Sequence, residues 1–486
     1  MAKESIRKKT FINMLWRFVE RCGAQGVSFI VSVILARLLV PKDYGTIALI
    51  MVFINVLQVF VDSGIASALI QKKEADEIDF STAFFFNIVS CSVMYLIMFF
   101  SAPLIANYYG EVRLVSLIRV VSLTLVISGV KNVQQAYVSR NLLFKKFFFS
   151  SLGGTIGAAI IGILMAYNGM GVWALVFQQL FNTTVDTIIL WITVKWRPRF
   201  LFSIKRLKEL LNFGWKMLVS ALMETVYSNV QQLIIGKKYS PTDLAFYNRG
   251  TTFPNIIITN ITTSIDSVLF PVMSQKQDDR NDLKNMTRKS IMTSVYIMAP
   301  LMVGFMAAAK PIVIILLTEK WLESIPYMRI FCITTIFYPI HTANLNAIKA
   351  MGRSDVFLKL EIVKKIVGIA TIIITMNISV MAMAYGLLFT SVACQIINSW
   401  PNKKLLKYNY LEQLKDILPT LISASLMGII IYMFTYLKLN SVIILLMQMI
   451  VGLVLYIVIS VIIRNETFYY LASIIKNIFL TKKIKK

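Results

Sequence analysis

The segment FINMLWRFVERCGAQGVSFIVSVILARLLVPKDYGTIA, residues 11–48, has the length and apolar character of a membrane-spanning helix followed by a polar turn. Its apolar run is interrupted by Arg17, Glu20, Arg21 and Gln25, whose spacing puts them on one helical face. A charge at the centre of a bilayer costs about 2.5–3.5 kcal/mol on insertion scales, so such residues usually face a bundle interior or a watery cavity. One glutamate can neutralise only one of the two arginines. The segment therefore predicts an anionic ligand as the missing partner.

The composition is that of a membrane protein built from helices. The chain has 486 residues, of which 57% are hydrophobic and 15% charged, and its mean hydropathy is +0.70. Apolar runs of about 18 or more residues recur from end to end, and each is long enough to cross the hydrocarbon core as a helix. We therefore predict an all-α polytopic membrane protein.

About fourteen apolar segments are predicted to cross the membrane. Most of the 50 Lys and Arg residues fall in connections on the side of the N-terminus, and this bias places both termini in the cytoplasm. The net charge of +26 then reflects topology and attraction to anionic lipid, and no nucleic-acid partner is expected. The predicted spans are 11–36, 44–66, 80–106, 114–130, 147–167, 172–194, 209–235, 244–271, 290–309, 324–348, 360–376, 380–400, 413–437 and 440–463.

The second part of the chain repeats features of the first. The matching positions are Trp16 and Arg17 with Trp215 and Lys216, Pro41 and Asp43 with Pro241 and Asp243, Asp62 with Asp266, and Arg140 with Arg353. Six spans per copy keep both copies in one orientation, so a pseudo-twofold axis is expected along the membrane normal. We predict two lobes around a central cavity, an N-lobe in residues 1–200 and a C-lobe in residues 201–403. Two extra spans fill residues 404–463, and residues 464–486 form a basic cytoplasmic tail.

Four cations inside the predicted spans are candidates for binding an anionic substrate. Arg17 and Lys216 occupy corresponding positions in the two copies, and Arg21 shares the polar face of Arg17. Arg249 lies in the eighth span, whose polar face is expected to line the cavity. Arginine binds phosphate through a bidentate fork and lysine adds a point charge, so a diphosphate head group suits this set. A structural ion pair between helices is the alternative for each cation taken alone.

Carboxylates on the spans predicted to face the cavity are candidates for ion coupling, and they are Asp62, Glu224 and Asp266. A carboxyl group in an apolar setting favours its protonated form or a bound cation, so each could take up H⁺ or Na⁺. A fixed pairing with a nearby Arg or Lys is equally consistent. The only histidine, His341, has no Cys or His at ligand spacing, and no loop is long enough for a catalytic domain. No enzyme activity, metal site or cofactor is therefore expected beyond such coupling.

Three stretches carry a family resemblance: ILARLLVPKDYG at 34–45, DSGIA at 62–66 and GVWAL at 171–175. They resemble the Wzx-type polysaccharide flippases of the multidrug/oligosaccharidyl-lipid/polysaccharide exporter superfamily. The resemblance implies a flippase of the bacterial cytoplasmic (inner) membrane that moves an undecaprenyl-diphosphate-linked oligosaccharide between leaflets by alternating access. It also implies that basic cavity residues engage the diphosphate, that an ion gradient drives transport, and that a polymerase and other glycan assembly proteins are partners. Arg17, Arg21 and Lys216 match that pattern in kind.

Other functions stay open at this point. A drug/cation antiporter could use the same scaffold, although it favours acidic or apolar cavity walls and the excess of Arg and Lys argues against it. A membrane-embedded glycan polymerase or glycosyltransferase should have a large outer loop or an acidic metal site, whereas the longest outer loops here have about a dozen residues. A noncatalytic scaffold of a glycan assembly complex would use the last two spans as its docking surface.

Overall fold

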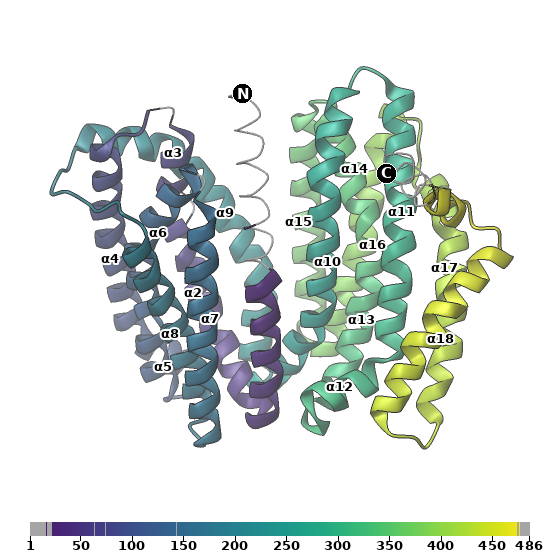
Figure 1. Cartoon of the computed structure of the whole chain (residues 1–486), viewed down its shortest axis with the longest axis horizontal. Coiled ribbons are helices and arrows are strands. Elements are labelled where there is room, and N and C mark those ends of the chain that lie inside the picture. Colours follow the sequence, from purple (N-terminus) through teal and green to yellow (C-terminus); the bar gives the residue numbers. More distant parts are fainter. Residues whose placement is uncertain are drawn as a thin grey trace, which may run out of the picture. The chain divides into compact units, whose positions relative to one another are not determined.

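A computed structural model describes residues 16, 22–62, 64–72, 74–141, 143–473 and 476, with the side chains at 213, 263, 264 and 266–268 excepted. Within these residues every regular element is a helix, which confirms the all-α prediction (Figure 1). A first apolar helix, Cys22–Leu38, is followed by α2 (Pro41–Asp62), α3 (Ile65–Gln71), α4 (Glu77–Tyr109), α5 (Leu114–Val121), α6 (Leu123–Arg140), α7 (Phe144–Tyr167), α8 (Val172–Thr193) and α9 (Ile204–Lys238). The remaining helices are α10 (Pro241–Gln275), α11 (Arg280–Ala307), α12 (Ala309–Leu317), η1 (Glu319–Ser324), α13 (Ile325–Ile336), α14 (Tyr338–Ala350), α15 (Ser354–Thr375), α16 (Val380–Leu405), α17 (Tyr410–Met433), η2 (Phe434–Tyr436) and α18 (Ser441–Ile462).

Each predicted span overlaps a described helix, but fewer helices meet a strict test of length and hydropathy. Among the described residues, nine helical stretches are long and apolar enough to cross a membrane, and Cys22–Leu38 is a shorter apolar helix. The helices that fail are α9, α10, α13, α14 and α15. Polar faces lower the hydropathy of α9 and α10, charged residues interrupt α15, and the predicted span 324–348 is divided at Phe337 into α13 and α14. The number of crossings therefore stays a prediction.

The chain folds as two compact units, residues 1–245 and 246–486. In the first unit, α7 and α8 pair as a hairpin and α4 packs on α6 and α9. A core that includes Leu69, Phe80, Phe84, Val133 and Leu210 joins α3, α4, α6 and α9. Helix α9 was predicted to open the second repeat, yet it packs within the compact unit that holds the earlier spans.

Helix α9 lies antiparallel to α2, and glycines allow the two backbones to come close at both ends of the pair. A Cβ atom at Gly214 would come within 2.7 Å of the Gly64 backbone, just beyond the end of α2. Towards the other end of α2, a Cβ at Gly45 would overlap the backbone of Pro241, which follows α9. Gly45 belongs to the stretch Pro-Lys-Asp-Tyr-Gly, which was predicted as a polar turn but forms the start of α2. The start of α2 therefore lies directly against the residues that follow α9.

In the second unit, α11 packs on α13, α14 and α17, and α17 packs on α18. The hydroxyl of Tyr456 on α18 donates to the carbonyl of Tyr296 on α11 at 2.8 Å, and the Tyr296 hydroxyl bonds Ser460 Oγ at 3.1 Å. The fully buried amide of Gln413 on α17 accepts from Asn344 Nδ2 at 2.8 Å. Buried polar contacts thus tie the last two helices into this unit.

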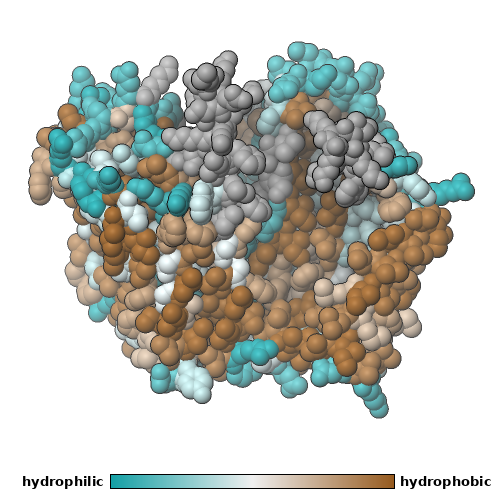
Figure 2. Space-filling model, in the orientation of Figure 1, coloured by the Kyte–Doolittle hydropathy of each residue, from teal (hydrophilic) through white to brown (hydrophobic). Residues whose placement is uncertain are grey.

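The outward side of α18 is almost wholly apolar. Only 22% of its most apolar stretch is buried, and it exposes large side chains such as Ile450, Leu453 and Val454. Figure 2 shows a largely brown surface over α18 and part of α17. Such a surface is stable in hydrocarbon and not in water, as expected for a multi-pass membrane protein.

Candidate functional site

Polar side chains gather inside the first unit where α2, α6 and α8 meet. Asp62 on α2 accepts hydrogen bonds from Gln58 Nε2 and from Asn132 Nδ2, each at 3.1 Å. The neighbour of Asn132 on α6, Lys131, forms an ion pair of 2.9 Å with Asp186 on α8. We call these five residues the α2–α6–α8 cluster. It joins three helices that are far apart in the sequence.

The helices explain why these side chains converge. Gln58 and Asp62 stand one turn apart on α2, so they share a face. Lys131 was predicted to lie just beyond the span 114–130. Helix α6 instead continues to Arg140, so Lys131 is in the middle of the helix, where its ammonium group reaches Asp186. Asp186 lies in the apolar helix α8 and was also missed. An acid in the middle of an apolar segment was the signal available in the sequence.

The cluster combines two carboxylates with one ammonium group. The side chains of Lys131 and Asp186 are 17% and 16% exposed, whereas Asp62 is exposed although two amides bind its Oδ1. Negative charge is therefore in excess, and part of it is accessible. Chemically, such a cluster can take up a proton or a monovalent cation without losing its internal ion pair.

The predicted substrate ligands are only partly described. Arg17 and Arg21 lie outside the described residues, and so does the side chain of Asp266. Lys216 is exposed on α9 and makes no hydrogen bond or ion pair within the described part of the chain. Glu224 is exposed eight residues further along α9, close to the same helical face.

The packing register brings Lys216 to the level of Asp62. Gly214 and Gly64 touch, and α2 and α9 run in opposite directions. Lys216 follows Gly214 by two residues, and Asp62 precedes Gly64 by two, so both lie on the same side of the glycine contact along the helix pair. Two of the residues singled out from the sequence are thus at similar depth.

Arg249 has a different environment in the second unit. It is 8% exposed on α10, and its guanidinium lies 5.1 Å from the ring centre of Trp321, a fully buried residue of η1. Burial against an aromatic face stabilises a cation by a cation–π interaction. Arg249 is therefore packed into the second unit, and its predicted contact with substrate stays a prediction.

His341 on α14 also contacts a buried polar group. Its Nδ1 lies 2.5 Å from the Nδ2 of Asn398 on α16, and its ring packs on Tyr338 at 5.4 Å. Within the described residues no three His, Cys, Asp or Glu side chains are grouped as metal ligands would be.

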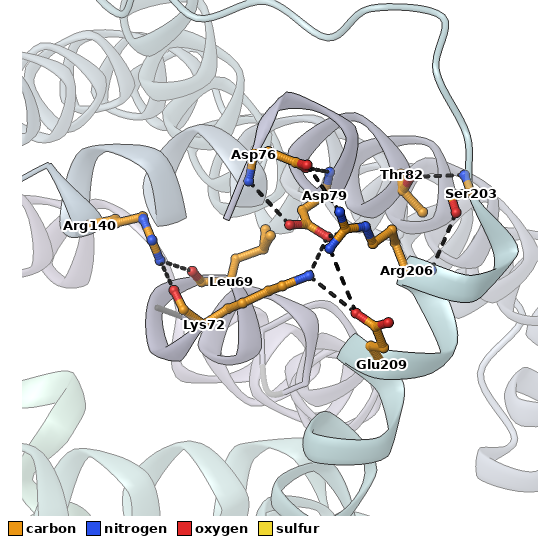
Figure 3. A network of polar contacts seen from close by, with 9 residues as sticks. All are labelled: Leu69, Lys72, Asp76, Asp79, Thr82, Arg140, Ser203, Arg206 and Glu209. Atoms are coloured by element: carbon orange, nitrogen blue, oxygen red, sulfur yellow. Dashed lines mark hydrogen bonds and ion pairs between the residues drawn. The ribbon is translucent and has the colours of Figure 1, made fainter. Parts of the chain in front are cut away.

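A second ionic cluster fastens the start of α9 to the loop before α4 (Figure 3). Asp79, which is fully buried, accepts from Lys72 Nζ at 2.7 Å and lies 3.9 Å from Arg206 Nε. Lys72 also pairs with Glu209 at 3.3 Å, and Arg206 pairs with Asp76 at 3.3 Å. We call these five residues the α4–α9 ion cluster. Its alternating charges hold α9 in position relative to α4.

Comparison with known proteins identifies relatives along most of the chain. A family model described as "Polysaccharide biosynthesis protein" matches residues 34–326. The succinoglycan biosynthesis transport protein ExoT of Rhizobium meliloti (strain 1021) is 25% identical over 71% of this chain and 70% of its own length. The teichuronic acid biosynthesis protein TuaB of Bacillus subtilis (strain 168) is 24% identical over 77% of this chain and 78% of its own. The lipopolysaccharide biosynthesis protein WzxC of Escherichia coli (strain K12) is 22% identical over 88% and 89%.

Two solved structures share the fold. The lipid II flippase MurJ in an inward closed conformation matches with a TM-score of 0.73 and 15% identity, over 94% of this chain and 99% of that one. An inward-facing multidrug resistance transporter of the MATE family matches with a TM-score of 0.60 and 14% identity, over 80% and 98%. The family model covers more than half of the sequence, and the predicted resemblance is confirmed. This chain belongs to the polysaccharide biosynthesis protein family.

Proposed function

We propose that this protein is a flippase that carries an undecaprenyl-diphosphate-linked oligosaccharide across the bacterial cytoplasmic membrane for polysaccharide biosynthesis. Relatives that span most of the chain are named for succinoglycan transport, teichuronic acid synthesis and lipopolysaccharide synthesis. These glycans differ, so the names share the biosynthesis of polysaccharides and not one sugar; we infer that the substrate common to this family is a lipid-linked repeat unit. The observation that carries the proposal is an accessible acid and an accessible cation, Asp62 and Lys216, at one depth in helices of such a family member.

The charged diphosphate is the part of this substrate whose transfer through hydrocarbon costs the most free energy. We assign its recognition to Arg17, Arg21, Lys216 and Arg249, because guanidinium and ammonium groups can replace the water lost by phosphate oxygens. Lys216 supports the assignment because it is exposed and forms no ion pair within the described residues. The sugar would contact polar side chains of α2, α9 and α10, while the isoprenoid tail stays in lipid.

We assign ion coupling to Asp62, with Glu224 and Asp266 as further candidates. Asp62 is open on one side and held on the other by Gln58 and Asn132, so it can exchange H⁺ or Na⁺ while its position is kept. The Lys131–Asp186 pair is neutral as a whole, so neutralising Asp62 would remove the net negative charge of the cluster and with it the repulsion of a diphosphate.

The proposal includes an orientation and a working cycle. Both termini are assigned to the cytoplasm by the distribution of Lys and Arg. The repeat suggests lobes in residues 1–200 and 201–403 that alternate in access, with residues 404–463 as an addition. A polymerase and other glycan assembly proteins are the expected partners, and the chain itself transports and performs no bond chemistry.

Export complementation tests the proposal. Variants Arg17→Ala, Arg21→Ala and Lys216→Ala are expressed at matched levels in a strain lacking the gene, and lipid-linked intermediates are assayed in each leaflet. Loss of export with accumulation of the diphosphate-linked oligosaccharide in the inner leaflet is expected. Normal export in all three variants would remove these cations from the site. Normal glycan after deletion of the gene would contradict the flippase proposal and favour a drug or cation antiporter.

A further inference from the structure

The connection between α8 and α9 is pinned to the surface of α4 at two points. The backbone N–H of Arg199 donates to Ser81 Oγ at 3.1 Å, and the backbone N–H of Ser203 donates to Thr82 Oγ1 at 3.1 Å. The second contact is drawn in Figure 3, beside the α4–α9 ion cluster. Arg199 Nε also lies 2.8 Å from Glu77 at the start of α4. Residues 200–202, which lie between these two hydrogen bonds, are therefore held as a fixed loop.

An aromatic base supports this loop. The ring of Trp196 stacks on Tyr137 at 6.1 Å and packs against Phe80 and Phe84. Gln134 Nε2 donates to the carbonyl of Trp196 at 3.0 Å. Since these partners come from α4 and α6, the loop is part of the first unit.

The tip of the loop is apolar and exposed. Phe200 is 97% exposed and Phe202 is 54% exposed. The Phe200 ring stacks on Phe85 of α4 at 5.7 Å. Together with Phe86 and Val89, these rings line an open pocket of about 410 Å³ whose described lining is entirely apolar. A pinned aromatic tip of this kind would be unfavourable in water.

The position of the pocket along α4 indicates that it lies at the level of the lipid acyl chains. Phe85 and Val89 lie eight and twelve residues into α4 from Glu77, which corresponds to about 12–18 Å along the helix. Half of the hydrocarbon core is about 15 Å thick. Only 17% of the most apolar stretch of α4 is buried in protein, so most of this helix is open to contact with acyl chains. The residues on its other side, Asn87 and Cys91, pack on Gly129 of α6.

The loop also carries positive charge at its base. Lys195, Arg197, Arg199 and Lys205 are exposed, and residues 194–206 contain no acidic residue. Arg199 keeps 69% of its side chain exposed although it pairs with Glu77. Cations above an apolar pocket complement a molecule with an anionic head and an acyl tail.

We propose that this pocket binds one acyl chain of an anionic phospholipid of the cytoplasmic leaflet, whose phosphate is held by the cations of the loop. A resident bilayer lipid is favoured over the transported lipid, because the pocket opens on the side of α4 away from α6 and the α2–α6–α8 cluster. The bound lipid anchors the connection from which α9 starts. The choice of the cytoplasmic leaflet rests on the orientation given with the proposed function, whereas lipid binding in the pocket does not require transport.

Lipid retention tests the proposal. The full chain is purified from bilayers of phosphatidylglycerol, phosphatidylethanolamine and undecaprenyl phosphate, and the lipids that remain bound are identified by native mass spectrometry. The double variant Phe200→Ser/Phe202→Ser should retain about tenfold less phosphatidylglycerol, because the apolar contact that holds the chain is lost. Leu104→Ser is the matched control, since Leu104 is 72% exposed near the other end of α4. Equal retention in the double variant and the wild type would overturn the proposal, and so would retention of an undecaprenyl lipid in place of phospholipid.

A depth measurement covers the case in which the double variant fails to fold. The four native cysteines are replaced, Phe200→Cys is spin-labelled, and its collisions with oxygen and with a water-soluble nickel complex are compared. A label inside the acyl region collides more with oxygen, as the proposal requires. Preferential collision with the nickel complex would place the loop in water and overturn the proposal.

Discussion

The Nζ atom of Lys131 and the Oδ2 atom of Asp186 lie 2.9 Å apart, although 55 residues separate them in the sequence. Each residue alone would be expensive within a membrane helix. Paired, they form a charged contact between α6 and α8 beside the accessible carboxylate of Asp62. Their pairing neutralises both groups inside the first unit and leaves the carboxylate of Asp62 as the charge that protonation can change.

Removing one partner of this pair should destabilise the protein more than removing both. In Lys131→Gln the carboxylate of Asp186 is left without its cation, which is expected to cost about 1–3 kcal/mol because the side chain is largely buried. The double variant Lys131→Gln/Asp186→Asn should recover most of that loss. Thermal unfolding in detergent measures both. Equal melting temperatures for the single variant and the wild type would show that the pair contributes nothing to stability.

Asp62→Asn should abolish the coupling of transport to an ion gradient while leaving the stability of the fold nearly unchanged. The amide keeps the shape of the aspartate and still offers an oxygen to Gln58 and Asn132, so stability should change by less than about 1 kcal/mol. The charge that exchanges H⁺ or Na⁺ is gone. Transport in proteoliposomes should therefore lose its dependence on an imposed pH or sodium gradient. A variant that responds to the gradient as the wild type does would exclude Asp62 from coupling.

Much of the fold could be predicted from the sequence because the signal for a membrane helix is local. Long apolar runs identified the helical architecture, but the stretch Pro-Lys-Asp-Tyr-Gly was predicted as a turn and is the helical start of α2. The predicted span 114–130 nevertheless stopped at Lys131, because a charge lowers the local hydropathy. The helix continues because Asp186 compensates that charge from another helix. No window along the sequence can detect such a partner, so the cluster around Asp62 was only partly predicted.

The glycine contact between α2 and α9 should be asymmetric. A methyl group at Gly214 would come within 2.7 Å of the Gly64 backbone, whereas a methyl group at Gly64 would meet Gly214 at an ordinary 3.5 Å. Gly214→Ala should therefore move α9 and cost about 1–3 kcal/mol as overpacking, while Gly64→Ala should be tolerated. Melting temperature and export at matched expression measure the effect. Equal behaviour of the two variants would contradict the described helix register.

The α4–α9 ion cluster should also contribute to stability. Arg206→Gln removes a cation shared by Asp76 and the buried Asp79, with an expected loss of about 1 kcal/mol because Arg206 is partly exposed. Lys208→Gln removes an equivalent charge from an exposed site nearby and is the control. If the two variants melt at the same temperature, the cluster is dispensable.

Acid should weaken the same cluster. The backbone N–H of Asp79, followed by the guanidinium of Arg206, holds the pKa of Asp76 below its ordinary value of 3.8. A carboxyl whose pKa is lowered by folding stabilises the protein fully above its ordinary pKa, and that stabilisation is lost as the pH falls below it. The melting temperature of Asp76→Asn should thus fall less than that of the wild type between about pH 5 and pH 3. Parallel curves for the two proteins would contradict this assignment.

The predicted repeat relates the Lys131–Asp186 pair to His341 and Asn398. Matching positions are further apart in the sequence for Arg140 and Arg353 than for Asp62 and Asp266. When the separation expected from this trend is added to the numbers of Lys131 and Asp186, the matching positions fall within a residue or two of His341 and Asn398. These two residues also contact each other, between α14 and α16.

If the repeat is correct, the second unit should tolerate a Lys–Asp ion pair in place of His341 and Asn398. His341→Lys alone places an ammonium group opposite an amide and should be destabilising, and Asn398→Asp added to it should restore stability. A double-mutant cycle of melting temperatures measures the coupling, expected to exceed about 1 kcal/mol for groups in contact. Ser391→Asp in place of Asn398→Asp is the control, because Ser391 lies on the same helix but bonds a backbone carbonyl of α13. Additive effects in both cycles would mean that the correspondence between the two pairs is accidental.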